Sequence, residues 1–241
     1  MNISLHIGRT GLNANQYKMD SIADEISNVN TIGFKKKELS FRELLNTDNI
    51  SAGTASLVSK VNFNQGIFIE SQSPYHLAIE GDGFFGVESN GEILLTRDGG
   101  FTIDSENNVV DKDGNRLVID YTVEPNEWLN GDITINNDGY IYQNYDGNVT
   151  QLGRIVLFYP ENLDSLIPVD GGKFLQNGLT FNSLENEFNF GNIKQYYLEQ
   201  SNVDLTKSLT DMIITQRAYS MSGKVVETAD EIYNMTNNLK R

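Results

Sequence analysis

Apolar residues repeat with two different periods along the chain, which predicts helical ends and a β centre. Between residues 3 and 29 apolar side chains recur every seven residues, and two further apolar positions join them in the second half. The repeating positions are Leu5, Leu12, Met19 and Ile26, and the additional ones are Ile22 and Val29. This spacing predicts an N-terminal helix over residues 1–30, and Gly33 breaks the pattern after it.

The C-terminal segment carries the longest helical pattern of the chain. One set, which we call the heptad stripe, consists of Leu198, Leu205, Met212, Tyr219, Val226 and Tyr233. A second set, the opposite stripe, consists of Ile214, Ala218, Met221, Val225, Ile232, Met235 and Leu239. At about 100° per residue the two sets lie roughly 180° apart around one helix. We therefore predict a helix over residues 198–241.

Two apolar stripes on one helix require two partners, because a surface helix normally buries a single stripe. The N-terminal helix can cover one of them, and we predict that the two helices pair as a coiled coil. The other stripe must then be covered by the β region or by further copies of the chain. A helix of about 37 residues would be near 55 Å long and would extend beyond a small β domain. We therefore favour further copies.

Residues 76–184 show the pattern of an all-β domain of short antiparallel strands, so the predicted fold class is α+β. Short apolar runs, separated by Gly, Asn and Asp turns, lie at 77–79, 84–87, 93–96, 101–103, 116–119, 133–135, 140–143 and 154–158. We interpret residues 31–75 and 185–197 as connecting segments. The first of these contains a helical option at 38–45 and a polar linker at 46–60.

Charge separates the same regions. The 241 residues carry a net charge of −15. Residues 71–190 hold 5 basic and 20 acidic residues, whereas 1–70 hold 7 of each and 191–241 hold 6 of each. An acidic chain is a poor partner for nucleic acid, whereas neutral ends can pack together without repulsion. No apolar run approaches the 18 or so residues of a membrane span, and the first residues lack a secretory apolar core.

Candidate chemistry is sparse, and the sequence predicts no enzyme and no catalytic, cofactor or metal site. The absence of cysteine excludes disulfides, thiol catalysis and Cys-ligated metals. GDGFFG at 81–86 has dinucleotide-loop spacing, but a turn and a second strand follow it instead of a helix. DKDGN at 111–115 lacks the ligand spacing of a calcium loop, so we predict a turn there too. A hydrolase-type carboxylate pair in the acidic region stays open as an alternative.

Several stretches together resemble the rod and hook proteins of the bacterial flagellum. SIADEISNVNTIGFKKKELSFRELL (21–45) is similar to the N-terminal signature of that family, and LAIEGDGFFGV (77–87) and LLTRDGGFTIDSENNVVDKDGNRL (94–117) are similar to the start of its β domain. Residues 197–239 resemble its C-terminal helix, whereas the likeness is weak over 120–185. The signature positions are Asn28, Asn30, Thr31, Gly33, Phe34, Lys35, Ser201, Asn202, Val203, Gln216, Arg217, Ala218 and Tyr219.

The resemblance implies a structural subunit of the flagellar basal-body rod, which assembles through its terminal helices into a torque-transmitting helical tube. The implied partners are other copies of itself and neighbouring rod and hook proteins, and the implied route is export without a cleaved signal. Distal rod members usually carry a longer segment where this chain has residues 46–60, so the distal and proximal positions both stay open. The alternatives are a hook-type or other axial subunit and, outside the family, an acidic β binding module on a coiled-coil stalk.

Overall fold

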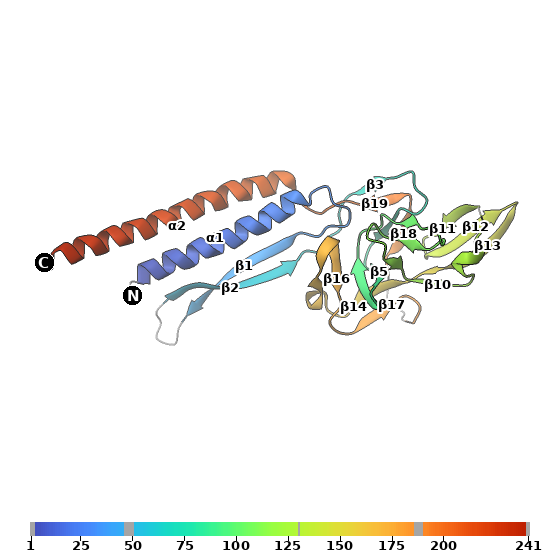
Figure 1. Ribbon diagram of the computed structural model, residues 1–241, viewed down its shortest axis with the longest axis horizontal. Coiled ribbons are helices and arrows are strands. Elements are labelled where there is room, and N and C mark those ends of the chain that lie inside the picture. Colours follow the sequence, from blue (N-terminus) through green and yellow to red (C-terminus); the bar gives the residue numbers. More distant parts are fainter. Residues whose placement is uncertain (1–2, 46–50, 130, 186–189, 240–241) are drawn as a thin grey trace. The chain divides into compact units, whose positions relative to one another are not determined.

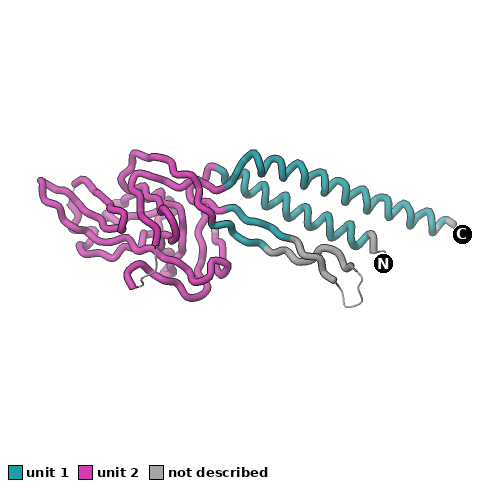
Figure 2. Tube along the Cα trace, turned by 180° about the vertical axis from the view of Figure 1, so that it is seen from behind, with its two compact units in different colours: residues 1–29, 36–63, 203–241 teal, residues 30–35, 64–202 magenta. Residues whose placement is uncertain are grey.

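The chain folds into two compact units. The computed structural model describes residues 3–45, 51–129, 131–185 and 190–239. Unit 1 comprises residues 1–29, 36–63 and 203–241, and unit 2 comprises residues 30–35 and 64–202 (Figure 2). The short segment 30–35 therefore belongs to unit 2, although the chain on both sides of it belongs to unit 1.

Unit 1 consists of two helices and a β hairpin (Figure 1). Its elements are α1 (Ile3–Ser27), β1 (Lys37–Leu45), β2 (Ser51–Val61) and α2 (Leu205–Leu239). Helix α1 packs against both α2 and the hairpin. The helices run antiparallel, since Asn15 near the middle of α1 contacts Ser222 and Glu25 near its end contacts Ser208. The predicted terminal helices are thus both present and in contact, while their coiled-coil packing stays a prediction.

The hairpin corrects the expectation for residues 38–60. Neither the helical option at 38–45 nor the polar linker at 46–60 is right, because β1 and β2 pair antiparallel with Lys37 opposite Val61. Residues 46–50 of the expected linker lie outside the described residues. The apolar positions at 39, 41 and 45 also fit the two-residue period of a strand. Such a short run fits either period, and tertiary pairing decides between them.

The C-terminal helix begins later than its apolar pattern indicates. It starts at Leu205 and not at residue 198, because Asp204 caps it: the Asp204 carboxylate accepts a hydrogen bond from the Lys207 amide at 3.1 Å. Leu198, predicted as the first residue of the heptad stripe, lies instead in strand β19. Its apolar side chain is buried in that strand. Because Leu198 lies seven residues before Leu205, the sequence pattern counted this buried strand residue as one more helical repeat.

Unit 2 contains the remaining strands, which pair antiparallel. A four-stranded sheet has the order β10-β13-β12-β11, and a nine-stranded sheet has the order β15-β16-β6-β5-β9-β8-β7, with β14 pairing to β5 and β17. The elements are β3 (Phe68–Glu70), β4 (Leu77–Glu80), β5 (Phe84–Ser89), β6 (Glu92–Thr96), β7 (Thr102–Ile103), β8 (Val109–Val110), β9 (Arg116–Leu117), β10 (Ile119–Tyr121), η1 (Pro125–Glu127), β11 (Asp132–Ile135), β12 (Tyr140–Tyr145), β13 (Asn148–Ile155), β14 (Leu157–Pro160), η2 (Leu163–Ser165), β15 (Ile167–Pro168), η3 (Asp170–Gly172), β16 (Lys173–Leu175), β17 (Thr180–Asn182), β18 (Asn192–Gln195) and β19 (Tyr197–Glu199).

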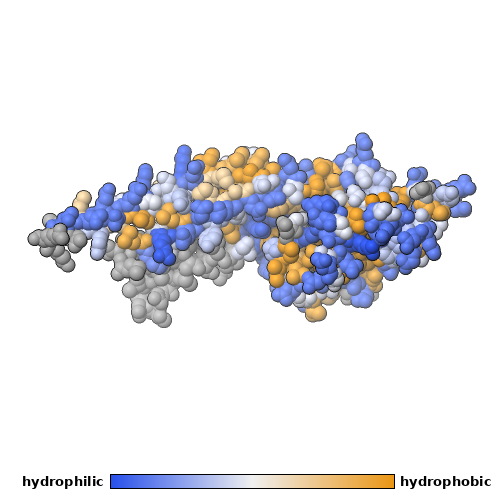
Figure 3. All heavy atoms as spheres, viewed as in Figure 1, coloured by the Kyte–Doolittle hydropathy of each residue, from blue (hydrophilic) through white to orange (hydrophobic). Residues whose placement is uncertain are grey.

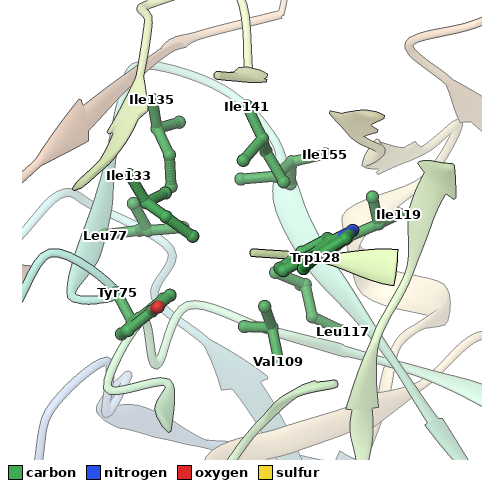
Figure 4. A pocket seen from close by; sticks show the side chains of 10 residues that line it. All are labelled: Tyr75, Leu77, Val109, Leu117, Ile119, Trp128, Ile133, Ile135, Ile141 and Ile155. Atoms are coloured by element: carbon green, nitrogen blue, oxygen red, sulfur yellow. The ribbon is translucent and has the colours of Figure 1, made fainter. Parts of the chain in front are cut away.

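One apolar core joins these sheets. Side chains from β4, β5, β11, β12 and β13 meet in it, and Trp128 closes one side while its indole N–H donates to the Val123 carbonyl at 3.0 Å. Ten side chains surround a small gap in this core, as Figure 4 shows. The gap measures about 10 Å³, which is at the lower limit for a single water molecule, so it is a packing defect and not a ligand site. The predicted antiparallel β centre is confirmed.

The segment that returns to α2 is part of the β unit, which corrects the expected linker at 185–197. Strand β18 pairs with β4, and β19 pairs with β3, a strand inside the other expected connecting segment. Ile193 of β18 is part of the apolar core, and Glu199 of β19 is fully buried. Among the described residues, β3 and β4 pair with strands from this return segment alone. The β unit therefore extends over residues 64–202.

These boundaries predict that a fragment of residues 64–202 folds cooperatively, whereas a fragment of residues 76–184 does not. The shorter fragment lacks β3, β18 and β19, which leaves β4 without a partner strand and the core without Ile193. Thermal unfolding followed by circular dichroism should show one sharp transition for the longer fragment and a shallow, non-cooperative change for the shorter one. A sharp transition of the shorter fragment would mean that the return segment is dispensable.

Candidate assembly surface and signature junction

The glycine-rich stretch at 81–86 forms a turn between two strands, as predicted. Gly81 and Gly83 adopt φ of 110° and 133°, a backbone region that favours glycine. The chain then enters β5 and not a helix, so no helix N-terminus faces these glycines to hold a phosphate. At Gly86 inside β5, an added Cβ would lie 2.3 Å from the Phe158 ring. The third glycine therefore serves close packing.

The acidic stretch at 111–115 also forms the predicted turn. Asp111 accepts hydrogen bonds from the backbone amides of Asp113 and Asn115 at 2.9 and 2.8 Å. The Lys173 ammonium lies 2.8 Å from the Asp111 carboxylate and also binds Asp113. Lys173 thus neutralises the oxygens that the calcium alternative would need.

Within the described ranges, no three His, Asp or Glu side chains gather as a metal site would require, and no helix is both long and apolar enough to cross a membrane.

The face of α2 that meets α1 is built from small and polar side chains. At Gly8 of α1, an added Cβ would lie 2.6 Å from the Val226 side chain, so the helices approach closely there. Further along the contact, Asn15 donates to the Ser222 hydroxyl at 3.4 Å. The positions of α2 along this contact, which we call the seam, are Ser208, Met212, Thr215, Ala218, Ser222, Val226 and Ala229. Five of these seven side chains are small or polar, and Met212 and Val226 are the larger apolar ones.

The heptad stripe coincides with the seam only in part. Met212 and Val226 are half-buried, whereas Leu205, Tyr219 and Tyr233 are exposed. On α1 the predicted positions Leu5, Leu12, Met19 and Ile26 are half-buried, and the additional residue Ile22 is buried. Small residues carry the closest contact, and they do not appear in a pattern of large apolar side chains.

Five members of the opposite stripe are exposed in the single chain, whereas Ala218, predicted as a member, lies half-buried in the seam, and the side chain of Leu239 lies outside the described residues. Val225 is 49% exposed, and Ile214, Met221, Ile232 and Met235 are still more accessible. Leu209 and Ile213 add further exposed apolar surface to the first half of α2, where Figure 3 shows hydrophobic residues gathered. Large exposed apolar patches mark interaction sites in soluble proteins. The stripe with Val225 therefore has the character of an assembly surface.

A carboxylate inside the helix pair makes the pairing sensitive to pH. Glu25 accepts a hydrogen bond from the Ser208 hydroxyl at 2.9 Å. Burial raises the pKa of Glu25 above its ordinary value, and the neighbouring charges of Asp211 and Asp24 add to this rise, while Ser208 and Lys36 oppose it. Because the pKa of Glu25 is raised in the folded state, its protonated form favours the paired helices. This contribution to the stability of the helix pair is fully present below the ordinary pKa of a glutamate and is lost as pH rises through the raised value.

We therefore expect mild acidification to strengthen the helix pair and Glu25→Gln to remove this pH response. The amide oxygen of the introduced glutamine would still accept from Ser208. Hydrogen exchange of α1 amides at pH 7 and pH 5 measures the effect, with Glu227→Gln on the exposed side of α2 as the matched control. An unchanged pH response in Glu25→Gln would show that another group is responsible.

The N-terminal signature docks into unit 2. Gly33 has a left-handed φ of 68°, and its amide donates to the Glu199 carbonyl at 2.8 Å. An added Cβ on Gly33 would lie 2.3 Å from the Asp98 backbone nitrogen, so only glycine fits. Phe34 is buried next to it, and its carbonyl accepts from the Asn202 amide at 3.3 Å.

Glu199 forms ion pairs with two buried cations from distant parts of the chain. Its Oε1 lies 2.6 Å from Lys35 Nζ, and its Oε2 lies 3.4 Å from an Arg97 guanidinium nitrogen. The Gly66 amide donates to the same carboxylate at 2.8 Å, and Arg97 also donates to the Gly81 carbonyl at 2.8 Å. Burial lowers the pKa of both Lys35 and Arg97, while the negative charge of Glu199 acts against this on both. Three of the four stretches that carry the family resemblance thus meet at one carboxylate, and the fourth accepts a hydrogen bond from Arg97 at Gly81.

The remaining signature residues have diverse positions. Asn28 ends α1, since its side-chain amide donates to the Asp24 carbonyl at 2.9 Å. Asn202 donates from its side chain to the Asn64 carbonyl at 3.0 Å. Thr31 and Val203 are half-buried, Ser201 is buried and Asn30 is exposed. On α2, Ala218 lies in the seam, whereas Gln216 and Arg217 are exposed.

Glu199 and Arg97 were absent from the residues predicted to matter. Arg97 lies in the stretch 94–117 and Glu199 in the stretch 197–239, and both stretches carry the family resemblance. The immediate neighbours of the two residues gave no signal of burial, since Glu199 lies between Leu198 and Gln200, and Arg97 lies between Thr96 and Asp98.

Comparison with known proteins finds two family models. The model described as "Flagellar basal body rod FlgEFG protein C-terminal" matches residues 194–239, and that described as "Flagellar hook protein FlgE/F/G D1 domain" matches residues 78–143. These ranges include α2 and much of the β unit.

Curated relatives match almost the whole chain. The chain is 32% identical to the flagellar basal-body rod protein FlgG of Agrobacterium fabrum over 98% of its length and 99% of that protein. It is 30% identical to FlgG of Borreliella burgdorferi, over 99% and 98% respectively. It is also 31% identical to the rod protein FlgF of Caulobacter vibrioides, over 96% and 95%.

Proposed function

The chain belongs to the family of flagellar basal-body rod proteins and is a structural subunit of the rod, and we propose that it assembles with other copies of itself through the exposed stripe of α2. The family is one of structural proteins and not of enzymes. The observation that carries the proposal is the exposure of Val225, Met221 and Ile232 on a helix whose other face α1 already covers.

Exposed apolar surface on both faces beside the seam favours contacts that continue from subunit to subunit. A patch that meets a different patch on the next copy does not close on itself and produces a helical array. Val225 and Ile232 lie on one side of α2, and Leu209 and Ile213 lie on another. Such an array is the helical tube that transmits torque in the proposed role.

The partners we propose are other copies of the chain and neighbouring rod and hook proteins of the flagellum. The family model named for a hook protein keeps a hook-type or other axial subunit as the second candidate. The relatives include both FlgG and FlgF rod proteins, so the proposal covers a distal or a proximal position.

We propose further that the subunit still contains α1 when it reaches the basal body. Helix α1 begins at Ile3 and supplies the seam contact at Gly8, so removal of a leader of about 20 residues would destroy the helix pair. Mass spectrometry of the subunit in isolated basal bodies should find the N-terminal peptide. A subunit that lacks its first helix would contradict this route.

Electron microscopy of the concentrated protein, with light scattering over a concentration series, tests the assembly proposal. We expect elongated polymers whose length grows with concentration. A small oligomer of fixed size at every concentration would instead indicate the acidic β binding module on a helical stalk.

A further inference from the structure

Residues 30–35 are held in unit 2 by a few specific contacts and contribute no strand to it. The Gly33 amide binds the Glu199 carbonyl, the Asn202 amide binds the Phe34 carbonyl, and Lys35 Nζ donates to the Asn64 carbonyl at 2.8 Å. The strand pairs of unit 2 all lie within residues 68–199. Removing residues 30–35 from their site would therefore leave these strand pairs intact.

We propose that residues 30–35 form a releasable latch, which docks into unit 2 through Gly33, Phe34 and Lys35 and undocks as a whole while the strands of unit 2 stay folded. Both flanking segments belong to unit 1, so the latch joins α1 to β1. The inference concerns the chain's own conformations and does not depend on the rod function.

The charges tie the latch to one carboxylate. With the latch docked, Lys35 and Arg97 both contact the carboxylate of Glu199, and the side chains of Lys35 and Glu199 are fully buried. Asp82, which is exposed and also attracts Arg97, supplies a second negative charge, so the docked cluster contains two cations and two carboxylates. Undocking returns Lys35 to water and breaks its ion pair with Glu199, while Arg97 keeps Glu199 and Asp82 as counter-charges. The ion pair of Lys35 therefore opposes undocking and sets how often the latch opens.

The shape of the site makes docking specific. Gly33 lies so close to the backbone of Arg97 and Asp98 that a Cβ would lie 2.5 Å from the Arg97 carbonyl carbon. Phe34 buries an aromatic ring at the same time. Because a tight backbone fit and a buried ring are lost together, the latch is expected to be docked or free, with no partly docked state.

Release would loosen the connection between α1 and β1. Six residues in extended form span at most about 20 Å, at roughly 3.3–3.6 Å per residue. A docked latch holds these six residues in unit 2. In an undocked latch the same six residues form a flexible connection between α1 and β1. The latch thus acts as a joint whose freedom depends on the contacts of one carboxylate.

Hydrogen exchange of single amides in the full chain tests the latch. The reporters are the amides of Gly33 and Asn202, and the references are Val118 and Ile193, whose amides bond to Gly86 and Asn137 inside unit 2. We expect the reporters to be protected but to exchange at least about tenfold faster than the references, as local opening requires. Exchange of reporters and references at the same rate would overturn the proposal, and so would an absence of protection at the reporters.

Two glycine variants separate the latch from general backbone strain. Gly33→Ala blocks docking, whereas Gly91→Ala places the same methyl group at a φ of 83° where no atom lies within 4 Å. In Gly33→Ala the Asn202 amide should exchange at least about tenfold faster while Val118 and Ile193 stay unchanged. Gly91→Ala should leave Asn202 unchanged. Loss of protection at Val118 and Ile193 in Gly33→Ala would show that residues 30–35 are integral to the β unit.

Charge variants provide the second route. Lys35→Met removes the ion pair that ties the latch to Glu199 and should speed exchange at the Asn202 amide while Val118 and Ile193 stay unchanged. Glu199→Gln removes the carboxylate that Lys35 binds and should also speed exchange at Asn202. Unchanged exchange at Asn202 in Lys35→Met would show that the ion pair does not hold the latch, and the glycine pair stays informative if Glu199→Gln fails to fold.

Discussion

Val225→Asp is expected to abolish polymerisation while leaving the folding of unit 2 unchanged. The side chain is exposed in the single chain, so an aspartate there is hydrated and harmless to the isolated subunit. In the assembly it would place an unpaired charge in an apolar interface, at a cost of several kcal/mol per contact. The cost recurs at every subunit, so assembly should fail and not merely weaken.

The matched control is Val149→Asp, the same substitution at a valine that is 67% exposed in β13 of unit 2. Sedimentation of concentrated protein should show polymers for the wild type and for this control, and none for Val225→Asp. Thermal unfolding of unit 2 should be the same in all three. Normal polymers of Val225→Asp would show that the stripe is not an assembly surface. A lowered melting temperature of unit 2 would show that Val225 packs within its own chain.

Gly8→Leu should separate α1 from α2. Even a Cβ at this position would lie 2.6 Å from the Val226 side chain, and Val226 is β-branched and has little rotamer freedom. A leucine adds three further carbons to a closely packed seam, and overpacking of this kind costs about 1–3 kcal/mol. The close approach at Gly8 leaves no room for these carbons, so the pairing should be lost.

Gly223→Leu is the matched control, because no atom lies within 4 Å of a Cβ built there. Both changes replace a helical glycine and raise helix propensity by up to about 1 kcal/mol. Hydrogen exchange of α1 should therefore accelerate strongly in Gly8→Leu and stay the same or slow slightly in Gly223→Leu. Equal behaviour of the two variants would mean that the close approach at Gly8 does not hold the helices together.

The periodic parts of the fold were predictable from the sequence, and the parts set by distant contacts were not. Repeats of large apolar residues located both helices, and alternating runs with glycine turns located most strands from β4 to β14. The start of α2 was misplaced because a buried leucine at 198 fits a strand and a helical repeat equally well. The β1–β2 hairpin was missed because its short apolar run fits either period.

The site was predictable in outline only. The exposed stripe follows from counting apolar faces on one helix, since two faces cannot be covered by one partner. The seam was not visible, because Gly8, Thr215 and Ser222 are small or polar and leave no mark in an apolar pattern, and Ala218 was assigned to the opposite stripe. The Glu199 cluster joins positions 35, 97 and 199, and no local spacing links residues so far apart in the chain.

Thiol labelling can show whether the face of α2 with Val225 is covered in the polymer, since the chain has no cysteine of its own. The thiol introduced by Val225→Cys should react rapidly with a maleimide in the dilute subunit and become protected at least about tenfold in pelleted polymers, as burial in a packed interface requires. The variant Val149→Cys in unit 2 reports the accessibility of a surface outside the helices. Protection of the Val225→Cys thiol in the polymer, beyond any change in the Val149→Cys variant, is the predicted result. Equally rapid labelling of the Val225→Cys variant in subunit and polymer would contradict assembly through this face of α2.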